Sequence, residues 1–381
     1  MRCKSGRELY MGAERLKNRI DIRVKKMNLG NGNHKKYDGT RRSNIQYMKK
    51  IVLRSLILVI AISGCIAMLA FKSTEKIKVA FLVHDLVADR WLMDMENFTN
   101  KVADLGGEAI TRNGLGDAET QVEQGKRLID EGVKVIVVVP QDGKVLAKLV
   151  DYADKKGAKI IAYDRMIVDC DLHYYISYNS VQVGELMAEY ALKAKPKGNY
   201  VILNGPSSDN NALLVRQGIM NKLKSHIDAG KVKVLMEKEM SSWYALSSMS
   251  VMDEFVQRNK LPIDAVITGA DDLASGVIDV FKSSNIRIPV ITGQDASVDA
   301  CRNIILGNQS MTIYKSVKKL SSEAAILSMK IARGEKIDFT STMNNGKKEV
   351  PSILFNPIVV DKSNLKTTVI QDGHIDESFL K

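Results

Sequence analysis

The chain alternates repeatedly between short apolar runs and longer amphipathic segments. From Lys76 onward, near-continuous apolar runs such as Ile77–Val83, Val133–Val139 and Ala158–Tyr163 each lead into a segment with helical spacing. Strands that lack strict polar alternation are buried on both faces, which is typical of a parallel sheet covered by helices on both sides. The pattern therefore predicts an α/β fold built on parallel sheets.

The strand–helix pattern restarts after Tyr174–Ser177, and 381 residues suffice for two domains with full cores. We therefore predict two doubly wound parallel-sheet domains. The leftover strand, helix and final strand (Ser352–Val360) are too few for a third domain, so they should complete the first two. The predicted boundaries are 76–178 plus 313–340 for the N-terminal domain and 179–312 plus 341–381 for the C-terminal domain.

The net charge of +12 is confined to the start of the chain. Residues 1–47 carry a net charge of +9, and Lys49, Lys50 and Arg54 supply the rest, so the remainder is electrically balanced. Nucleic-acid binding requires clustered Lys and Arg, and the main body lacks that excess. Residues 1–47 are predicted to be a disordered basic tail, or sequence upstream of the true start codon.

Residues 48–72 have the pattern of a secretory signal or a membrane anchor. Met48-Lys49-Lys50 precedes an apolar stretch, and Ile62-Ser63-Gly64-Cys65 resembles a lipoprotein box in which Cys65 would be lipidated. The uncharged run Ser55–Phe71 is 17 residues long, at the lower limit for spanning a bilayer. Both alternatives put the remainder on the extracytoplasmic face of the cell membrane, because the basic residues precede the apolar segment.

Sequence signatures of enzymes, cofactors and metals are missing. The four cysteines form no C-x-x-C pair, and the five histidines are scattered. The first strand is followed by V-H-D-L-V-A-D-R in place of a glycine-rich dinucleotide loop, and neither a P-loop nor a G-x-S-x-G elbow occurs. We predict a protein that is not an enzyme and that needs no cofactor or metal.

Polar and aromatic side chains follow almost every predicted strand, at the edge where open α/β sheets bind ligands. Planar arginines and carboxylates form paired hydrogen bonds with vicinal hydroxyls, and tryptophan faces cover apolar C–H surfaces. This set suits a neutral polyhydroxylated ring. The candidate residues are Arg90, Trp91, Asp164, Arg165, Asp209, Asn211, Trp243, Asp271, Asp295 and Lys315.

Each candidate also has a structural alternative. Asp164-Arg165 could be a surface ion pair worth about 0–1 kcal/mol. Asp209 and Asp271 could be helix N-caps, which favour aspartate. The two tryptophans could belong to the core. The shared position of all these residues at one edge of both sheets favours a binding cleft.

Several motifs resemble a known family. A-Y-D-R-M at 162–166, S-D-N-N-A at 208–212, G-Q-D-A at 293–296 and M-T-I-Y-K at 311–315 are similar to those of the ribose/galactose-type periplasmic sugar-binding proteins (type I periplasmic binding proteins), and most similar to their xylose-binding subgroup. The resemblance covers Lys76 to Gly373. It implies two α/β domains that are joined by three crossovers and close on the sugar like a hinge.

The resemblance also implies roles for individual residues. It places the sugar contacts on Arg90, Asp164, Arg165, Asn211, Trp243, Asp295 and Lys315, with Trp91 as a stacking face. One position departs from the family, because Ala270 stands before Asp271 where the family has asparagine. The loss of this amide predicts weaker or altered sugar affinity.

Two functions fit these features, and a third shares only the fold. The first is a membrane-tethered receptor that binds a monosaccharide, D-xylose in particular, and presents it to an ABC permease. In the second, the same closing domains signal to a sensor histidine kinase of the membrane. The third is a LacI-type repressor, which would need a helix-turn-helix where this chain has an apolar segment. The expected partners are the sugar, the membrane and a permease or kinase, without nucleic acid.

Overall fold

The computed structural model describes residues 46–56, 76–87, 89–339 and 341–380, and the chain divides into two compact units, 1–75 and 76–381. In the first unit, residues 46–56 form an exposed helix. The other residues of the predicted basic tail and of the predicted signal or anchor, Cys65 included, lie outside the described residues. Among the described helices, none is both long and apolar enough to cross a bilayer.

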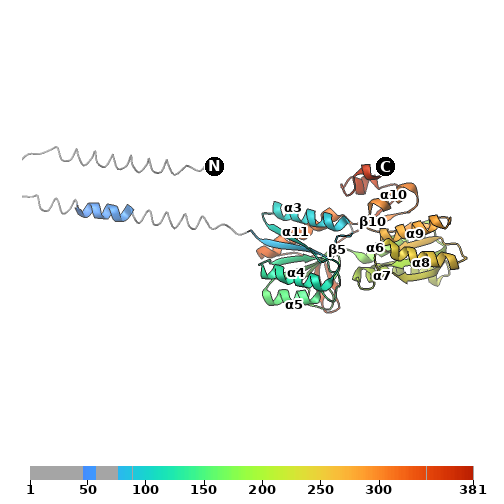
Figure 1. Cartoon of the computed structure of the whole chain (residues 1–381), viewed down its shortest axis with the longest axis horizontal. Helices are drawn as coiled ribbons and strands as arrows, with labels where there is room; N and C mark the ends of the chain where they lie inside the picture. Colours follow the sequence, from blue (N-terminus) through green and yellow to red (C-terminus); the bar gives the residue numbers. More distant parts are fainter. Residues whose placement is uncertain (1–45, 57–75, 88, 340, 381) are drawn as a thin grey trace, which may run out of the picture. The chain divides into compact units, whose positions relative to one another are not determined.

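The first lobe of the unit 76–381 is built on a large, mostly parallel sheet (Figure 1). Its neighbouring strands run parallel except for the pair β11–β12 at one edge. In spatial order, seven of the described strands form it: β11 (Ser341–Asn344), β12 (Glu349–Phe355), β5 (Tyr174–Tyr178), β4 (Lys159–Tyr163), β3 (Val135–Val138), β1 (Lys78–Val83) and β2 (Glu108–Asn113).

Helices cover both faces of this sheet, as the apolar strands predicted. In β1, Ala80 and Leu82 face one core, whereas Phe81 and Val83 face the other. Successive side chains of a strand point to opposite faces, so a strand between two cores must be apolar throughout. The helices are α4 (Ala118–Asp130) and α5 (Ala147–Lys156) on the first face, and α3 (Asp89–Asp104) and α11 (Val317–Arg333) on the second (Figure 1).

The second lobe repeats this arrangement on a smaller parallel sheet of four described strands. Their order is β7 (Val232–Glu239), β6 (Gly198–Asn204), β8 (Ala265–Thr268) and β9 (Val290–Thr292). One face is covered by α6 (Ser180–Ala194) and α7 (Asn210–Asp228), the other by α8 (Ala245–Arg258) and α9 (Asp271–Ser283). Beside this sheet, β10 (Thr312–Tyr314) pairs with β13 (Ile358–Val360), and α10 (Val298–Leu306) packs near them.

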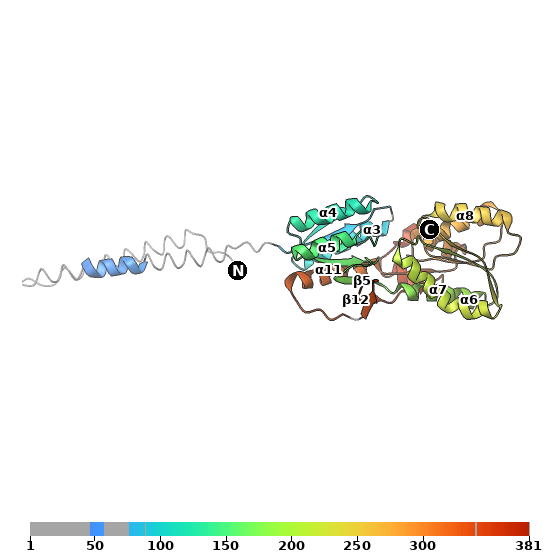
Figure 2. The ribbon, with the colours of Figure 1, turned by 90° about the horizontal axis from the view of Figure 1, so that it is seen from below.

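The last part of the chain is divided between the lobes differently from the prediction. Residues 341–355 form β11 and β12 in the first sheet, so placing 341–381 wholly in the second domain was wrong. Figure 2 shows β12 and α11 in the lobe of α4 and α5. The predicted strand Ser352–Val360 is two strands, because Pro357 lacks the N–H needed to continue a ladder. The predicted start of the returning segment at residue 313 also shifts, since β10 (Thr312–Tyr314) pairs with β13 in the second lobe.

The described chain therefore passes between the lobes three times. The passages lie between β5 and α6, between β10 and α11, and between β12 and β13. At the second passage, the Tyr178 hydroxyl donates to the carbonyl of Ser316 over 3.2 Å, which ties two of the passages together. Three neighbouring connections form a joint about which two rigid lobes can rotate.

Two glycines bring α6 and α7 into backbone contact. A Cβ on Gly184 would lie 1.9 Å from the carbonyl oxygen of Val215, and one on Gly218 would lie 1.9 Å from that of Val181. The close crossing aligns the first turns of both helices, where the Ser180 hydroxyl donates to Asn211 Oδ1 over 3.0 Å. The packing of this helix pair thereby fixes the position of Asn211, one of the predicted sugar contacts.

Candidate functional site

The carboxyl ends of both parallel sheets face one cavity of about 690 Å³ between the lobes. This volume falls within the range of small-molecule sites, roughly 300–1,000 Å³. All of the side chains predicted from the strand ends line it: Arg90, Trp91, Asp164, Arg165, Asp209, Asn211, Trp243, Asp271, Asp295 and Lys315. The structure thus brings the whole predicted set together.

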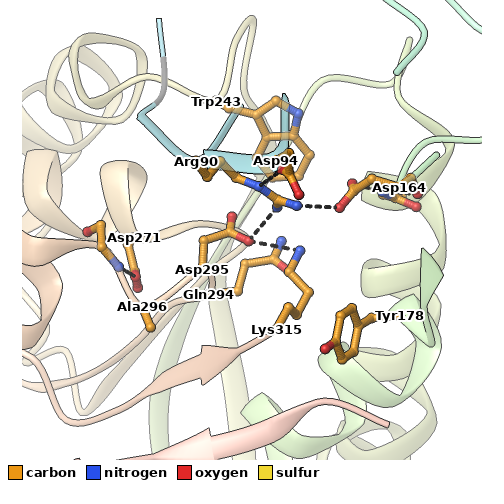
Figure 3. Close-up of polar contacts among 12 residues, drawn as sticks. Arg90, Asp94, Asp164, Tyr178, Trp243, Asp271, Gln294, Asp295, Ala296 and Lys315 are labelled. Carbon is orange, nitrogen blue, oxygen red and sulfur yellow. Dashed lines mark hydrogen bonds and ion pairs between the residues drawn. The ribbon is translucent and has the colours of Figure 1, made fainter. Parts of the chain in front are cut away.

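Arg90, in the first turn of α3, is the centre of the polar network (Figure 3). One terminal nitrogen binds Asp164 Oδ2 over 2.9 Å and the other binds Asp295 Oδ1 over 3.0 Å. Its Nε lies 3.6 Å from Asp94, one helical turn further on. Lys315 binds the same Asp295 oxygen over 2.9 Å. Since Asp164 follows β4 and Asp295 follows β9, this arginine connects the two lobes.

Further polar contacts cross the cavity between the lobes. Arg165 Nε binds Asp209 Oδ2 over 2.9 Å. The Asn211 amide donates to both the carbonyl and Oδ1 of Asp164, over 3.0 and 3.1 Å. Asp209 is also the N-cap of α7, because its Oδ1 accepts the Asn211 N–H. The cap and the site residue are therefore the same side chain, which uses a different oxygen for each role.

The two carboxylates that bind Arg90 sit on unusual backbone. Asp164 has φ of 62° and Asp295 has φ of 94°, and Ala296 follows with 49°. Left-handed conformations cost non-glycine residues about 1–3 kcal/mol and persist only where neighbours hold them. At Asp164 the carbonyl accepts the hydroxyls of Tyr175 and Ser177, over 2.8 and 2.9 Å. These bonds aim the carboxylate into the cavity.

Both of these carboxylates are ionised at neutral pH. Burial alone would raise the pKa of Asp164, but Arg90, Lys315 and Arg165 outweigh it and lower that pKa to about 2. Burial likewise opposes ionisation of Asp295, whose pKa is nevertheless lowered by Lys315 and Arg90. Ionised carboxylates accept short, strong hydrogen bonds from hydroxyl groups. The site therefore presents strong acceptors beside cationic donors.

Asp94 was not among the predicted site residues, and it is fully buried beside Arg90. It accepts the Tyr163 hydroxyl, and burial raises its pKa to about 7, although Arg90 opposes the rise. In the unfolded chain the same group titrates near 4. The folded state therefore binds the extra proton between about pH 4 and pH 7, and the stability this provides is lost as the pH rises through 7.

We expect Asp94→Asn to reveal this loss. Asparagine mimics the neutral acid and does not titrate. The unfolding free energy of the variant minus that of wild type should therefore be a few kcal/mol higher at pH 8 than at pH 4.5. Urea denaturation at both pH values measures it. Asp253→Asn, on the exposed side of α8, is the matched control and should show no such difference. A pH-independent difference for Asp94→Asn would contradict the assignment.

The two tryptophans are placed differently. Trp91 is 5% exposed and belongs to the core below α3, with the His84 ring against it edge-on. The Arg90 guanidinium lies 4.2 Å over the Trp91 ring, so the predicted stacking face is covered by a cation. Trp243 is half-buried and donates its indole N–H to Asp209 Oδ2 over 3.1 Å. Its ring lies against Gly205, where any Cβ would collide with it.

Asp271 lines the cavity, but both of its oxygens are engaged within the protein. Oδ1 accepts the Gln309 amide over 2.9 Å, and Oδ2 accepts the Ser297 N–H and the Thr312 hydroxyl, each over 2.9 Å. The carboxylate thus connects the start of α9 to the turn after β9 and to β10. The N-cap of α9 is Ala270, whose side chain makes no capping bond.

Ala270→Asn tests the departure from the family. Asparagine favours this N-cap position and adds an amide to the cavity wall, so helix stability should rise by about 0.5–2 kcal/mol. One added hydrogen bond to a sugar is worth about 0.5–1.5 kcal/mol, or roughly a twofold to tenfold lower Kd. Calorimetry measures the Kd, with Ala270→Ser as the variant that caps without reaching a ligand. Equal sugar affinity in all three proteins would contradict the prediction.

The cavity also contains residues that the strand-end rule did not select. His84 and Tyr244 line it, as do His374, Ile375 and Phe379 from the C-terminal tail. His84 directly follows β1, so it was visible at a strand end but was not chosen as a candidate, and Tyr244 lies next to the candidate Trp243. The tail follows the last strand and carries no motif, so its approach to the cavity had no sequence signal.

Comparisons with known proteins show to which family the chain belongs. A family profile for the periplasmic binding protein domain matches residues 79–336. The chain is 37% identical to the D-xylose-binding periplasmic protein of Haemophilus influenzae over 80% of this chain and 93% of that protein. It is 36% identical to the Escherichia coli protein of the same name, over 86% of this chain and 99% of that one.

A solved structure shares the fold. It is an ABC transporter solute-binding protein from Clostridium phytofermentans with bound β-D-glucose, and it superposes with a TM-score of 0.76 at 29% identity. The match covers 80% of this chain and all of the other. A binding-protein profile over most of the unit 76–381, with two relatives above 30% identity, identifies a binding protein rather than an enzyme. The chain belongs to the family of periplasmic sugar-binding proteins.

Proposed function

We propose that the chain is an extracytoplasmic receptor that binds D-xylose between its two lobes and presents it to an ABC importer. The names of the relatives support this proposal, because two of them are D-xylose-binding periplasmic proteins and a structural neighbour is an ABC transporter solute-binding protein. A membrane tether remains part of the proposal on the strength of the sequence of residues 48–72.

The main support for a sugar ligand is the set of polar groups that both lobes contribute to the cavity. Donors and acceptors from both lobes converge on one cavity, with Arg90, Arg165 and Asp164 from the first lobe and Asn211 and Asp295 from the second. A sugar hydroxyl both donates and accepts, so adjacent cations and carboxylates satisfy it better than either alone. A ligand held by both lobes favours the closed arrangement over any open one.

A thermal-shift screen tests the ligand class. A sugar at ~100 times its Kd should stabilise the folded protein by roughly 2.7 kcal/mol. We expect the largest shift with D-xylose, compared with L-arabinose, D-ribose and D-glucose at equal concentration. If none of the four sugars raises the melting temperature, the proposed function is wrong for all four of them; a larger shift with another of the four rejects only the assignment to xylose.

Uptake of labelled D-xylose tests the delivery step. Cells that lack this protein should accumulate the sugar more slowly at micromolar concentrations, and the intact gene should restore uptake. If uptake is normal but the transcriptional response to xylose is lost, the receptor signals to a kinase and the importer role is wrong. Sugar binding itself is judged independently by the thermal-shift screen.

A further inference from the structure

The C-terminal tail returns from β13 to the cavity. It includes the short π-helix η1 (Lys366–Ile370) and the 3-10 helix η2 (Glu377–Leu380), which packs beside α10 (Figure 1). Val369 and Ile375 are buried in a small core with residues of α10 and β10. The tail is thus packed as part of the second lobe, and His374 reaches the cavity wall.

Asp372 contacts both neighbours of Lys315. Its carboxylate accepts the Tyr314 hydroxyl and, over 2.7 Å, the Ser316 hydroxyl. Tyr314 ends β10, and Ser316 is the N-cap of α11, so Lys315 lies within a passage between the lobes. Because Lys315 is 8% exposed and binds Asp295, its backbone position decides where its ammonium points.

His374 packs beside the strand end that carries Lys315. Its ring packs against Tyr314 with centroids 5.0 Å apart. His374 lines the cavity together with Ala296 and Asp295, the residues with left-handed backbone in the turn after β9, and the backbone of these two residues acts to raise its pKa. Burial, followed by Arg90, outweighs this and lowers the pKa of His374, so the ring is neutral near pH 7 and keeps one N–H as a donor.

We propose that Asp372 and His374 form a positioning clamp that holds Lys315 and Asp295 in their sugar-binding geometry. The inference rests on the proposed function, since it assigns the clamp to that same site. Asp372 fixes the strand end that carries Lys315, and His374 fixes the strained turn that carries Asp295. Neither residue needs to touch the sugar, so they act as positioning residues through the 2.9 Å ion pair.

Three substitutions at His374 separate positioning from packing. His374→Phe keeps an aromatic ring against Tyr314 but removes the N–H donor, whereas His374→Asn and His374→Gln keep a donor and lose the ring. In full-length protein, we expect the Kd for D-xylose, measured by calorimetry, to rise at least tenfold in His374→Phe. At least one amide variant should stay within threefold of wild type. Retained affinity in His374→Phe, or equal loss in all three variants, would overturn the proposal.

Asp372→Ala tests the other half of the clamp. We expect at least a tenfold rise in Kd, because Tyr314 and Ser316 lose a shared acceptor. Lys366→Ala is the matched control in the same tail, since Lys366 forms an exposed ion pair with Glu377, and its Kd should equal that of wild type. Unchanged affinity in Asp372→Ala would contradict the clamp. If wild type itself binds no sugar, the proposed function fails before the clamp is tested.

Discussion

Arg90→Ala should abolish measurable D-xylose binding and should also weaken the fold. The guanidinium binds Asp164 and Asp295 and lies beside buried Asp94, so its removal leaves Asp164 and Asp94 without this ion-pair partner and Asp295 with Lys315 alone. Breaking a buried ion pair by removing one partner costs about 3–5 kcal/mol. The same loss from the free energy of sugar binding would raise the Kd roughly a hundredfold to several thousandfold, which calorimetry measures, and urea denaturation measures the loss of stability.

Two further variants sharpen this prediction. Arg90→Lys keeps the charge but not the planar fork that reaches two carboxylates at once, so its affinity should lie between those of wild type and alanine. Arg258→Ala, in an exposed pair with Glu254 on α8, should change neither Kd nor stability by a measurable amount. Sugar binding by Arg90→Ala within fivefold of wild type would contradict the central place of this residue.

Gly184→Ala should destabilise the second lobe severely. Helix propensity alone would favour alanine by about 0.5–1 kcal/mol. The new methyl group would, however, lie 1.9 Å from the Val215 carbonyl oxygen, which belongs to the backbone and cannot rotate away. We expect a net loss of about 3 kcal/mol or more in the unfolding free energy. Because the helix crossing positions Asn211, the surviving folded protein should also bind D-xylose more weakly.

Gln217→Ala provides the comparison for this helix pair. Gln217 lies next to Gly218 on the exposed side of α7, and its replacement should change the unfolding free energy by no more than about 0.5 kcal/mol. Gly218→Ala should reproduce the effect of Gly184→Ala, because its methyl would meet the Val181 carbonyl at the same distance. A stabilised Gly184→Ala protein would show that the helices can move apart without cost.

Much of the fold could be predicted because local patterns decide it. The continuous apolar strands required helices on both faces, and the structure has them in both lobes. The assignment of the last strands could not be predicted in this way. β12 and β13 are short apolar segments separated by Asn356-Pro357, and their choice of sheet depends on long-range pairing with Tyr175–Tyr178 and with β10.

The same distinction applies to the candidate site. Arg90, Asp164 and Asp295 could be predicted because parallel strands all end at one edge, so the residues that follow them must meet. The pairing of Arg165 with Asp209 across the lobes depends on how far the lobes close, which no strand pattern encodes. Asp94 was missed because a buried acid one turn after Arg90 looks like an ordinary helix residue.

Calorimetric titration of D-xylose into the full-length protein, beside Arg165→Ala, tests the central claim most directly. Arg165 follows β4 and binds Asp209 of the opposite lobe, so it belongs to the site without being the core of the fold. We predict a one-to-one isotherm for wild type and, for Arg165→Ala, a Kd at least a hundredfold higher. An absence of heat with wild type, or equal affinity in the two proteins, would contradict sugar binding in this cavity.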